Sequence, residues 1–563
     1  MKRTLYILFL FASVFAAASS KKPAPQPSPA APPETIPAMR VAMNAVNPLA
    51  IRAHVKFLSS DLLEGRGTGQ RGGDIAADYI ATQFALAGLQ PAGENGTYMQ
   101  RVPMVGVATD PSSSVAFTIK DKPLALRNLE DIVAIDESQS ATSDLDAPLV
   151  YVGYGIVAPE YNWNDYKDLD VKGKVLLMLV NEPPSEDPDF FKGPALTYYG
   201  RWTYKYEQAA RLGAAGVILI HQTAMASYGW DVVRNSWGGE RAYLRTENTQ
   251  KLKLAAWVQY DIAEKLAASI DKSADDLLRM AKMRDFKPIT LPVQIKTHMT
   301  SKIRPFESNN VIAELVGSDD KLKNEAVLYS AHYDHLGIRP GMAGDNIYNG
   351  AVDNATGCGM LIEMARAFAS TPQAPRRSIL FTAVTAEEQG LLGSEYLAHH
   401  LPIPAGKISI AFNFDGIRPD GVPEAIQASG AERTNFYLTT YGTAKEFGYD
   451  VKPDSNPAAG HYYRSDHFSF AHVGIPAFSV QEGLKYKGHP LDWGIQREND
   501  YDEHRYHQPG DEFDPTWDFS GLADLSRFSI ELGWKAAMQD ALVQWLPGDE
   551  FESVRQASEQ ASK

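Results

Sequence analysis

The feature that most constrains the fold is an alternation of short and long segments between residues 309 and 545. Short runs rich in β-branched and aromatic residues alternate with longer helix-like segments. The runs are AVLYS, SILFTAV, ISIAFNF and GIPAFSV, and the helix-like segments include ATGCGMLIEMARAFA and FSGLADLSRFSIELGWKAAM. This alternation is typical of an α/β domain. We predict an α/β fold with a mixed, mostly parallel sheet sandwiched by helices.

Chemically active side chains follow three of these strand-like runs. His332 and Asp334 come after AVLYSA, Glu387 and Glu388 after SILFTAVTA, and Asp415 after ISIAFN. In open α/β sheets, ligands bind outside the carboxyl ends of the strands. Because these strand ends converge at one edge of the sheet, the five side chains are predicted to lie close together.

A further acid, Asp353, lies in the loop NGAVDNATGCG just before a helix-like segment. Taken singly, each of these groups has a simpler explanation: an Asp before a helix is usually an N-cap, and a lone His or a pair of acids is usually solvated. Several carboxylates that converge without cations would repel one another strongly. Histidine with Asp and Glu suits zinc or another divalent first-row metal, so the sequence predicts a metal site.

Other catalytic chemistries have weaker support. The chain has no H-E-x-x-H and no G-x-S-x-G, and Cys358 lies inside a helix-like segment. Adjacent side chains such as Glu387 and Glu388 point in different directions, so one could bind metal while the other takes a proton from the metal-activated water. The residues alone leave open which acid has which role. The glycine-rich stretch LLEGRGTGQRGG lacks G-x-x-x-x-G-K-[ST], so we interpret it as an ordinary loop.

The first residues predict export. MKRTLYILFLFASVFAAASS has a basic start, an apolar run and small residues, as in a secretory signal peptide. The run is shorter than the roughly 20 residues of a membrane-spanning helix, so we expect cleavage, no stable membrane anchor, and a periplasmic or extracellular protein. The net charge of −15, with no long Lys/Arg run, argues against nucleic acid as a partner. One cysteine leaves no internal disulfide to form.

The middle of the chain, residues 110–300, differs in composition from the rest. It contains β-like runs such as APLVYVGYGIV, KGKVLLMLV and AAGVILIH, with few metal-ligating residues, which favours a small inserted domain. The predicted organisation is a signal peptide (1–18), a Pro/Ala-rich linker (19–40), the first part of the main domain (41–109), the insert (110–300), the rest of the main domain (301–546) and a polar, frayed tail (547–563).

Several motifs, in order, resemble one known family. SAHYDHLG, GAVDNATG, TAEEQGLLGS, NFDG and RYHQPGDEFD are similar to motifs of the co-catalytic two-zinc aminopeptidases related to glutamate carboxypeptidase and the transferrin receptor. GRGTG resembles the family's N-terminal segment. VYVGYGI, DVKGKVLLMLV and KYEQAARLGAAGVILI resemble a protease-associated (PA) domain. The resemblance implies a zinc-exopeptidase fold, two Zn²⁺ ions, and hydrolysis of N-terminal residues from peptides with a free N-terminus.

The resemblance also implies a set of metal ligands. His332 and Asp415 would bind the first zinc, Glu388 and His507 the second, and Asp353 would bridge both.

Catalytic roles are implied in the same way. Glu387 resembles the general base, Asp334 would orient His332, and Tyr506 is placed like a tyrosine that stabilises the oxyanion in some relatives. Asp466 or His467 would shape the pocket without binding metal. The other histidines are expected to be structural or solvated rather than ligands: His335, His461, His467, His472, His489 and His504.

Three alternatives stay open at this point. Glutaminyl cyclases share this fold and much of the ligand set but use one zinc. A carboxypeptidase of the same family would differ only in pocket residues. A non-catalytic binding protein, like the transferrin receptor, would have a degraded ligand set, whereas the five ligands named above are all present.

Overall fold

The computed structural model describes residues 37–562, apart from 168, 227, 238, 246–250, 340, 343 and 455–456. The predicted signal peptide and most of the predicted linker lie outside the described residues. Helix α1 (Ala38–Ala45) begins before residue 40 and buries Ala42 and Met43, so the linker ends earlier than predicted. None of the described helices has both the length and the apolar character needed to cross a membrane.

Four parallel strands form the centre of the main domain. They lie in the order β21 (Ala477–Ser479), β18 (Ile408–Asn413), β14 (Ala326–His332) and β17 (Ser378–Val384). β13 (Ile289–Leu315) pairs with β17 in the antiparallel direction. The sheet is therefore mixed and mostly parallel, as predicted.

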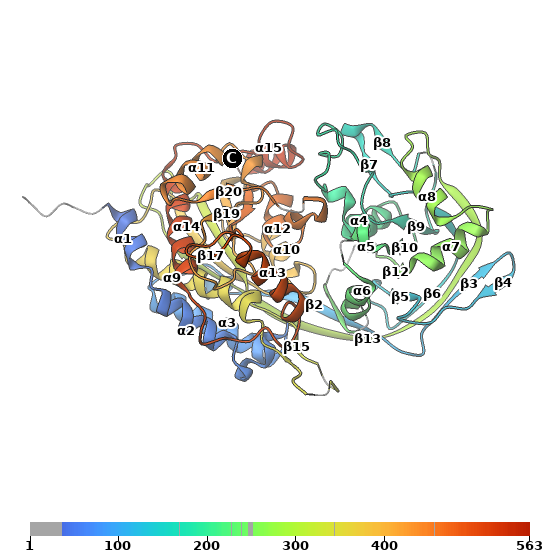
Figure 1. Ribbon diagram of the computed structural model, residues 1–563, viewed down its shortest axis with the longest axis horizontal. Coiled ribbons are helices and arrows are strands. Elements are labelled where there is room, and N and C mark those ends of the chain that lie inside the picture. Colours follow the sequence, from blue (N-terminus) through green and yellow to red (C-terminus); the bar gives the residue numbers. More distant parts are fainter. Residues whose placement is uncertain are drawn as a thin grey trace, which may run out of the picture. The chain divides into compact units, whose positions relative to one another are not determined.

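Both faces of this sheet are buried. Tyr329 and Phe381 point into a cluster that contains residues of the helices on one face. Leu328 and Leu380, one residue earlier in each strand, belong to the cluster on the opposite face. The first group of helices is α1, α2 (Pro48–Leu58), α3 (Arg71–Leu86), α9 (Gly357–Ala369) and α14 (Ser520–Met538), and the second is α10 (Leu392–His399) and α12 (His467–His472) (Figure 1). This two-sided burial explains why the strands are apolar along most of their length.

The insert has a sheet arrangement and hydrophobic clusters of its own. β6 (Thr142–Tyr151), β9 (Val175–Leu179), β10 (Gly216–Ile220) and β12 (Leu254–Val258) are parallel neighbours, and β5 (Ile132–Ile135) is antiparallel to β12. Two hydrophobic clusters contain only residues between 115 and 295. The resemblance of this insert to a PA domain stays a prediction.

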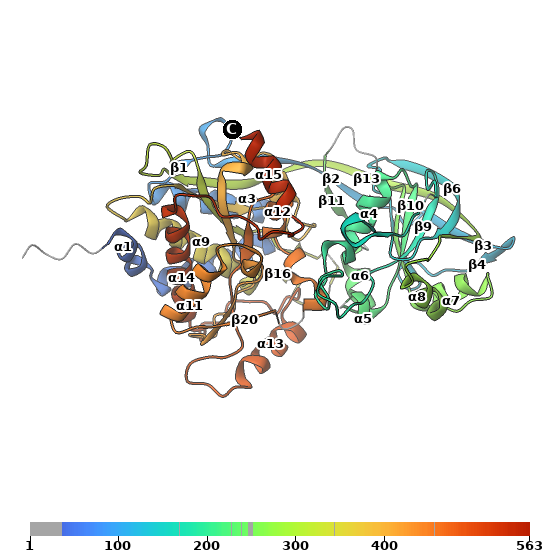
Figure 2. The same cartoon turned by 90° about the horizontal axis from the view of Figure 1, so that it is seen from above.

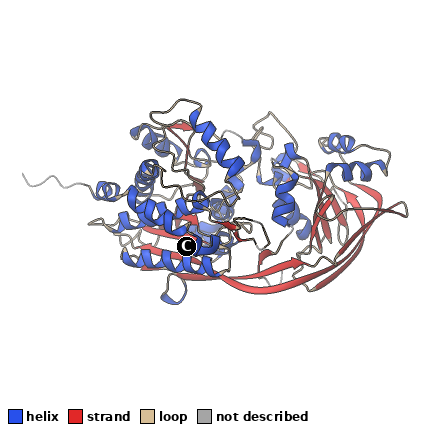
Figure 3. Cartoon of the chain, turned by 60° about the horizontal axis from the view of Figure 1, so that its bottom comes forward, coloured by secondary structure: helices blue, strands red, loops and turns tan. Residues whose placement is uncertain are grey.

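One strand connects the two groups of strands. The first half of β13 pairs with β3 and β6, and its last residues pair with β17 of the main domain (Figure 2). The long strands that link the two groups stand out in Figure 3. All described parts of the sheet therefore form one hydrogen-bonded network.

The remaining elements complete the described chain. The strands are β1 (Gln90–Pro91), β2 (Met99–Thr109), β3 (Ser114–Ile119), β4 (Lys122–Leu124), β7 (Val157–Ala158), β8 (Trp163–Asn164), β11 (Arg241–Leu244), β15 (Gly337–Ile338), β16 (Ile347–Tyr348), β19 (Ala425–Gln427), β20 (Asp450–Lys452) and β22 (Gln481–Glu482). The helices are α4 (Trp202–Arg211), α5 (Thr223–Ala226), α6 (Trp230–Trp237), α7 (Tyr260–Ala268), α8 (Ala274–Ala281), α11 (Tyr437–Glu446), α13 (Trp493–His504) and α15 (Glu552–Ala561).

The C-terminal tail was predicted to be frayed, but most of it forms a helix. It forms α15, whose Arg555 side chain is buried and donates hydrogen bonds to the carbonyl oxygens of Ala405, Ile408 and Val543. The sequence of the tail can stay polar because few of its side chains, among them Arg555 and Phe551, are buried. The prediction failed because composition does not reveal one buried arginine.

Candidate metal centre

Neighbouring strand ends bring the predicted side chains together. His332 is the last residue of β14 and lies opposite Val384, the last residue of β17. Glu387 follows β17 after a short turn, and Asp415 follows the end of β18. The parallel register of β14, β17 and β18 therefore places these residues at one edge of the sheet, as the sequence predicts.

Three side chains form a first cluster. The Nε2 atom of His332 lies 3.1 Å from Oδ1 of Asp415 and 3.2 Å from Oδ1 of Asp353. Each residue offers one ligand atom, and these atoms lie within 4.8 Å of one another. His332 is buried, whereas Asp415 is partly open to solvent. The Oγ of Ser465 donates to the other oxygen of Asp415 at 2.5 Å, which fixes that carboxylate.

A second cluster shares Asp353 with the first. The Oδ2 atom of Asp353 lies 3.2 Å from Nε2 of His507, and the same nitrogen lies 3.2 Å from Oε2 of Glu388. The two oxygens of Asp353 thus face different groups. All five predicted ligands are brought together, and we call them the metal centre: His332, Asp353, Glu388, Asp415 and His507.

The carboxylates of the centre raise the pKa values of its two histidines. Burial disfavours the charged form of His332, yet Asp415, Asp353 and Glu387 outweigh it and raise its pKa well above the ordinary value. Burial acts in the same way on His507, but Glu388 and Asp353 raise its pKa to about 9. Histidine and carboxylate donors are those that zinc accepts, so the donor set fits a divalent metal such as zinc.

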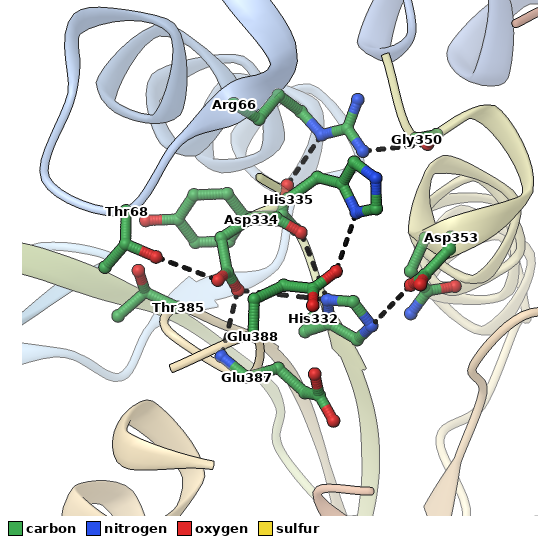
Figure 4. Close-up of polar contacts among 12 residues, drawn as sticks. Arg66, Thr68, His332, Asp334, His335, Gly350, Asp353, Thr385, Glu387 and Glu388 are labelled. Atoms are coloured by element: carbon green, nitrogen blue, oxygen red, sulfur yellow. Dashed lines mark hydrogen bonds and ion pairs between the residues drawn. The ribbon is translucent and has the colours of Figure 1, made fainter. Parts of the chain in front are cut away.

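The adjacent acids Glu387 and Glu388 differ in their surroundings. Glu388 is almost fully buried and contacts His507 and His335. Figure 4 shows the carboxylate of Glu387 directed away from that of Glu388. Burial raises the pKa of Glu387 well above its ordinary value, and Asp415 and Glu388 add to this effect while His332 opposes it.

Asp334 contacts His332 and Glu387 without belonging to the metal centre itself. Its buried carboxylate accepts hydrogen bonds from Thr68 Oγ1 at 2.9 Å and from the backbone N–H of Glu387 at 3.1 Å (Figure 4). The Nδ1 atom of His332 lies 3.2 Å from the backbone carbonyl of Asp334 and 3.8 Å from its carboxylate. The closer contact to His332 is thus made by the backbone of Asp334. Its carboxylate links Thr68, in the glycine-rich stretch, to the backbone of Glu387.

The remaining predicted residues lie beside the centre. Tyr506 is half exposed, and its ring stacks on His507 with the centroids 4.0 Å apart. Asp466 and His467 are buried but belong to neither cluster, and burial lowers the pKa of His467 to about 4. Four of the histidines that the sequence analysis expects to be structural or solvated are exposed: His461, His472, His489 and His504.

Sequence reasoning missed two residues of the site. His335 was expected to be structural or solvated, but it is buried with Nδ1 2.7 Å from Oε1 of Glu388, and it could complete a ligand set with Asp353 and Glu388. Asp511 accepts hydrogen bonds from the backbone N–H groups of Val352 and Asp353 at 3.0 Å. Both lie in the motifs already singled out, SAHYDHLG and RYHQPGDEFD, and that proximity was the available signal.

Comparisons with known proteins find relatives of part of this chain. A "Probable zinc metalloprotease" of Pyrenophora teres f. teres is 37% identical over 114 residues, which is 20% of this chain and 23% of that protein. Aminopeptidase YwaD of Bacillus subtilis is 30% identical over 194 residues, 34% of this chain and 37% of that one. The chain thus spans well under half the length of these curated relatives.

The solved structures and a family model extend the comparison. The aminopeptidase from Aneurinibacillus sp. strain AM-1 is similar in fold, with a TM-score of 0.50 at 18% identity over 91% of this chain and 98% of that one. The family model for peptidase family M28 matches residues 310–527, which contain the whole metal centre. Over these residues, the chain is similar to the members of peptidase family M28.

Proposed function

We propose that this protein is a zinc-dependent aminopeptidase that hydrolyses N-terminal residues from peptides with a free N-terminus. The observation that carries the proposal is Asp353, whose two carboxylate oxygens face two separate groups of histidine and carboxylate donors. A shared carboxylate of this kind suits two Zn²⁺ ions. The names of relatives, including Aminopeptidase YwaD, favour removal of N-terminal residues.

Each residue of the centre has a proposed part in the reaction. Divalent ions held there would supply Lewis acidity, which polarises the scissile carbonyl and acidifies the attacking water. Glu387 takes a proton from that water and returns it to the leaving amine, because its carboxylate is held beside the centre but outside both clusters. A positioned general base contributes about 10²–10⁴-fold to the rate. Tyr506, at the exposed edge beside His507, would donate a hydrogen bond to the oxyanion.

The proposal extends to the setting of the enzyme. We propose export through the N-terminal signal peptide, and a PA-like insert over residues 110–300 that shapes access for the substrate. Contacts between insert and main domain support that part. The Leu196 backbone N–H donates to the carbonyl of Pro457, and the Tyr198 ring packs against Phe468 with the centroids 4.7 Å apart. Phe468 lies three residues after Ser465, which holds Asp415.

The first test uses a panel of aminoacyl chromogenic substrates with native protein, chelator-treated protein, and chelator-treated protein after zinc is added back. We expect activity to disappear with the chelator and to return with zinc. Activity that survives complete removal of metal would refute a metallopeptidase.

A pair of variants tests the base. Glu387→Gln should retain zinc and lose about 10²–10⁴-fold in kcat, since only the proton acceptor is removed. Glu503→Gln is a matched control on an exposed glutamate near the site and should behave like the native enzyme. Near-native turnover by Glu387→Gln would assign the base elsewhere.

Product analysis separates the alternatives on the same fold. A peptide with an N-terminal glutamine gives pyroglutamate with a cyclase, a free N-terminal residue with an aminopeptidase, and a free C-terminal residue with a carboxypeptidase. Stoichiometric zinc without any of these products would indicate a binding protein.

A further inference from the structure

The glycine-rich segment, residues 63–69, is not the ordinary loop that its composition predicts. Arg66 at its centre is only 1% exposed. Its guanidinium forms no ion pair within the described part of the chain, although the buried carboxylates of Asp511, Asp353 and Asp334 are near enough to affect its pKa. A buried arginine without a carboxylate partner needs another explanation, because its desolvation is costly unless its N–H groups are satisfied.

Backbone carbonyl oxygens satisfy this guanidinium. Nε donates to Tyr333 at 2.7 Å, and Nη1 to Leu58 and Asn349 at 2.6 Å each. Nη2 donates to Gly350 at 2.8 Å (Figure 4). Four of the five N–H groups of the fork are therefore used, all on main-chain acceptors. The planar fork holds these acceptors in a fixed arrangement, which an ammonium group on a flexible stem cannot reproduce.

The carbonyl groups belong to the segments that carry metal ligands. Tyr333 directly follows His332 in the chain. Asn349 and Gly350 come just before Asp353. One side chain thus joins the segment of His332 to the segment of Asp353, and the Nε2–Oδ1 distance between these two ligands is 3.2 Å. Leu58, the last residue of α2, ties the same guanidinium to the N-terminal helices.

Neighbours of Arg66 strengthen this connection. Its own carbonyl accepts a hydrogen bond from the backbone N–H of His335 at 3.2 Å, and Thr68 holds the carboxylate of Asp334. Gly65 has φ of +67°, and a Cβ there would lie 2.5 Å from the Tyr348 carbonyl oxygen and 2.6 Å from that of Gly337. The segment therefore lies tightly between the two ligand-bearing segments.

We propose that Arg66 is a positioning residue of the metal centre, which sets the spacing between the segments of His332 and Asp353 and thereby the affinity for zinc. The inference rests on the proposed function, because it concerns the metals of that same site. Thr68 acts in the same direction through Asp334. Loss of partners behind metal ligands typically costs 10–100-fold in metal affinity or activity, which gives the expected scale.

The experiment measures zinc affinity directly, by competition between the metal-free protein and a chromophoric chelator. Arg66→Met removes the charge and the fork, and Arg66→Lys keeps the charge alone. Both should bind zinc about 10–100-fold more weakly than the native protein. Thr68→Val, which removes only the hydroxyl, should show a smaller loss of the same sign. Arg71→Met is the matched control, because Arg71 lies in the same region but forms an exposed ion pair with Glu64.

The possible outcomes distinguish failure of the positioning role of Arg66 from failure of the proposed function. Native zinc affinity in Arg66→Lys and Thr68→Val would overturn the positioning role, even if their unfolding stability fell, because that pattern belongs to a purely structural arginine. Absence of tight zinc binding by the native protein would overturn the proposed function and this inference together. Circular dichroism identifies variants that do not fold, and Thr68→Val then decides, since it leaves all four bonds of Arg66 in place.

Discussion

Two buried polar clusters in this chain balance their charges in different ways. In the insert, Lys205 is fully buried, and its Nζ donates to the carbonyl oxygens of Asn181 at 2.9 Å and Tyr199 at 2.6 Å. Burial lowers the pKa of Lys205 to about 7, against the opposing effect of Asp165 and Glu182. This cluster contains a lysine beside its two acids, so the chain itself supplies a cation there.

The metal centre contains acids but no lysine or arginine of its own. Its carboxylates Asp353, Glu388 and Asp415 pair with histidines, which give up their protons when they bind a metal ion. The backbone also differs: in the insert, N–H groups of Ile156 and Thr197 donate to the acids. The difference is that the acids of the insert lie near a lysine, whereas those of the metal centre meet histidines, which are metal ligands.

The largest expected effect comes from Asp353→Asn. The change removes the charge shared by both groups of ligands, so we expect loss of zinc and a fall in kcat/KM of at least about 10³-fold. Zinc content and kinetics are measured on the same preparation. Asp165→Asn makes the same chemical change in the insert and should leave the zinc content unaltered. Full zinc occupancy in Asp353→Asn would break the distinction between the two clusters.

The next effect is on stability. Lys205→Met leaves the buried carbonyl groups of Asn181 and Tyr199 without their donor and removes the cation that acts on Asp165 and Glu182, so we expect a loss of about 1–3 kcal/mol. Denaturant unfolding measures the loss. The folded fraction should bind zinc as the native protein does, because Lys205 lies outside the metal centre. A loss below about 1 kcal/mol would mean that the insert does not depend on its lysine.

A pH dependence follows from one acid of the insert. Burial raises the pKa of Glu137 to about 7 from an ordinary value near 4.5. The native state therefore binds more protons than the unfolded state between these values, and the free energy of unfolding falls as the pH rises through this window, by up to about 3 kcal/mol. In Glu137→Gln this fall should be absent. Identical pH profiles for the two proteins would show that Glu137 titrates normally.

The smallest expected effect is on the free energy of unfolding, from a change at Lys192, where the insert contacts the main domain. The Nζ atom of Lys192 lies 3.5 Å from Asp549 and from Glu550, and it is partly exposed. Arg433 holds the same two acids at 2.8 Å. Lys192→Met should therefore cost less than about 1 kcal/mol in denaturant unfolding. A larger loss would indicate that the long Lys192 contacts matter more than the shorter ones of Arg433.

The main-domain sheet and the meeting of His332, the Glu387–Glu388 pair and Asp415 at one edge could be predicted because their signals are local. Apolar runs end in His332, in the Glu387–Glu388 pair and near Asp415, and parallel strands bring such ends to one edge. The buried Arg555 of the tail could not be predicted, since a polar helix with one anchor has the composition of a solvated one. The contact of His335 with Glu388 could not be predicted either, because the two residues lie far apart in the sequence.

The order of residues along the chain was enough to define the class of fold and the kinds of ligand, because strand periodicity and side-chain chemistry are properties of short segments. Only the tertiary structure decided which oxygen of Asp353 faces which histidine, and that Arg66 bonds to carbonyl groups rather than to an acid. These features depend on contacts between residues far apart in sequence, such as Arg66 with Gly350. Such contacts form only when the segments pack, and no pattern within either segment specifies them.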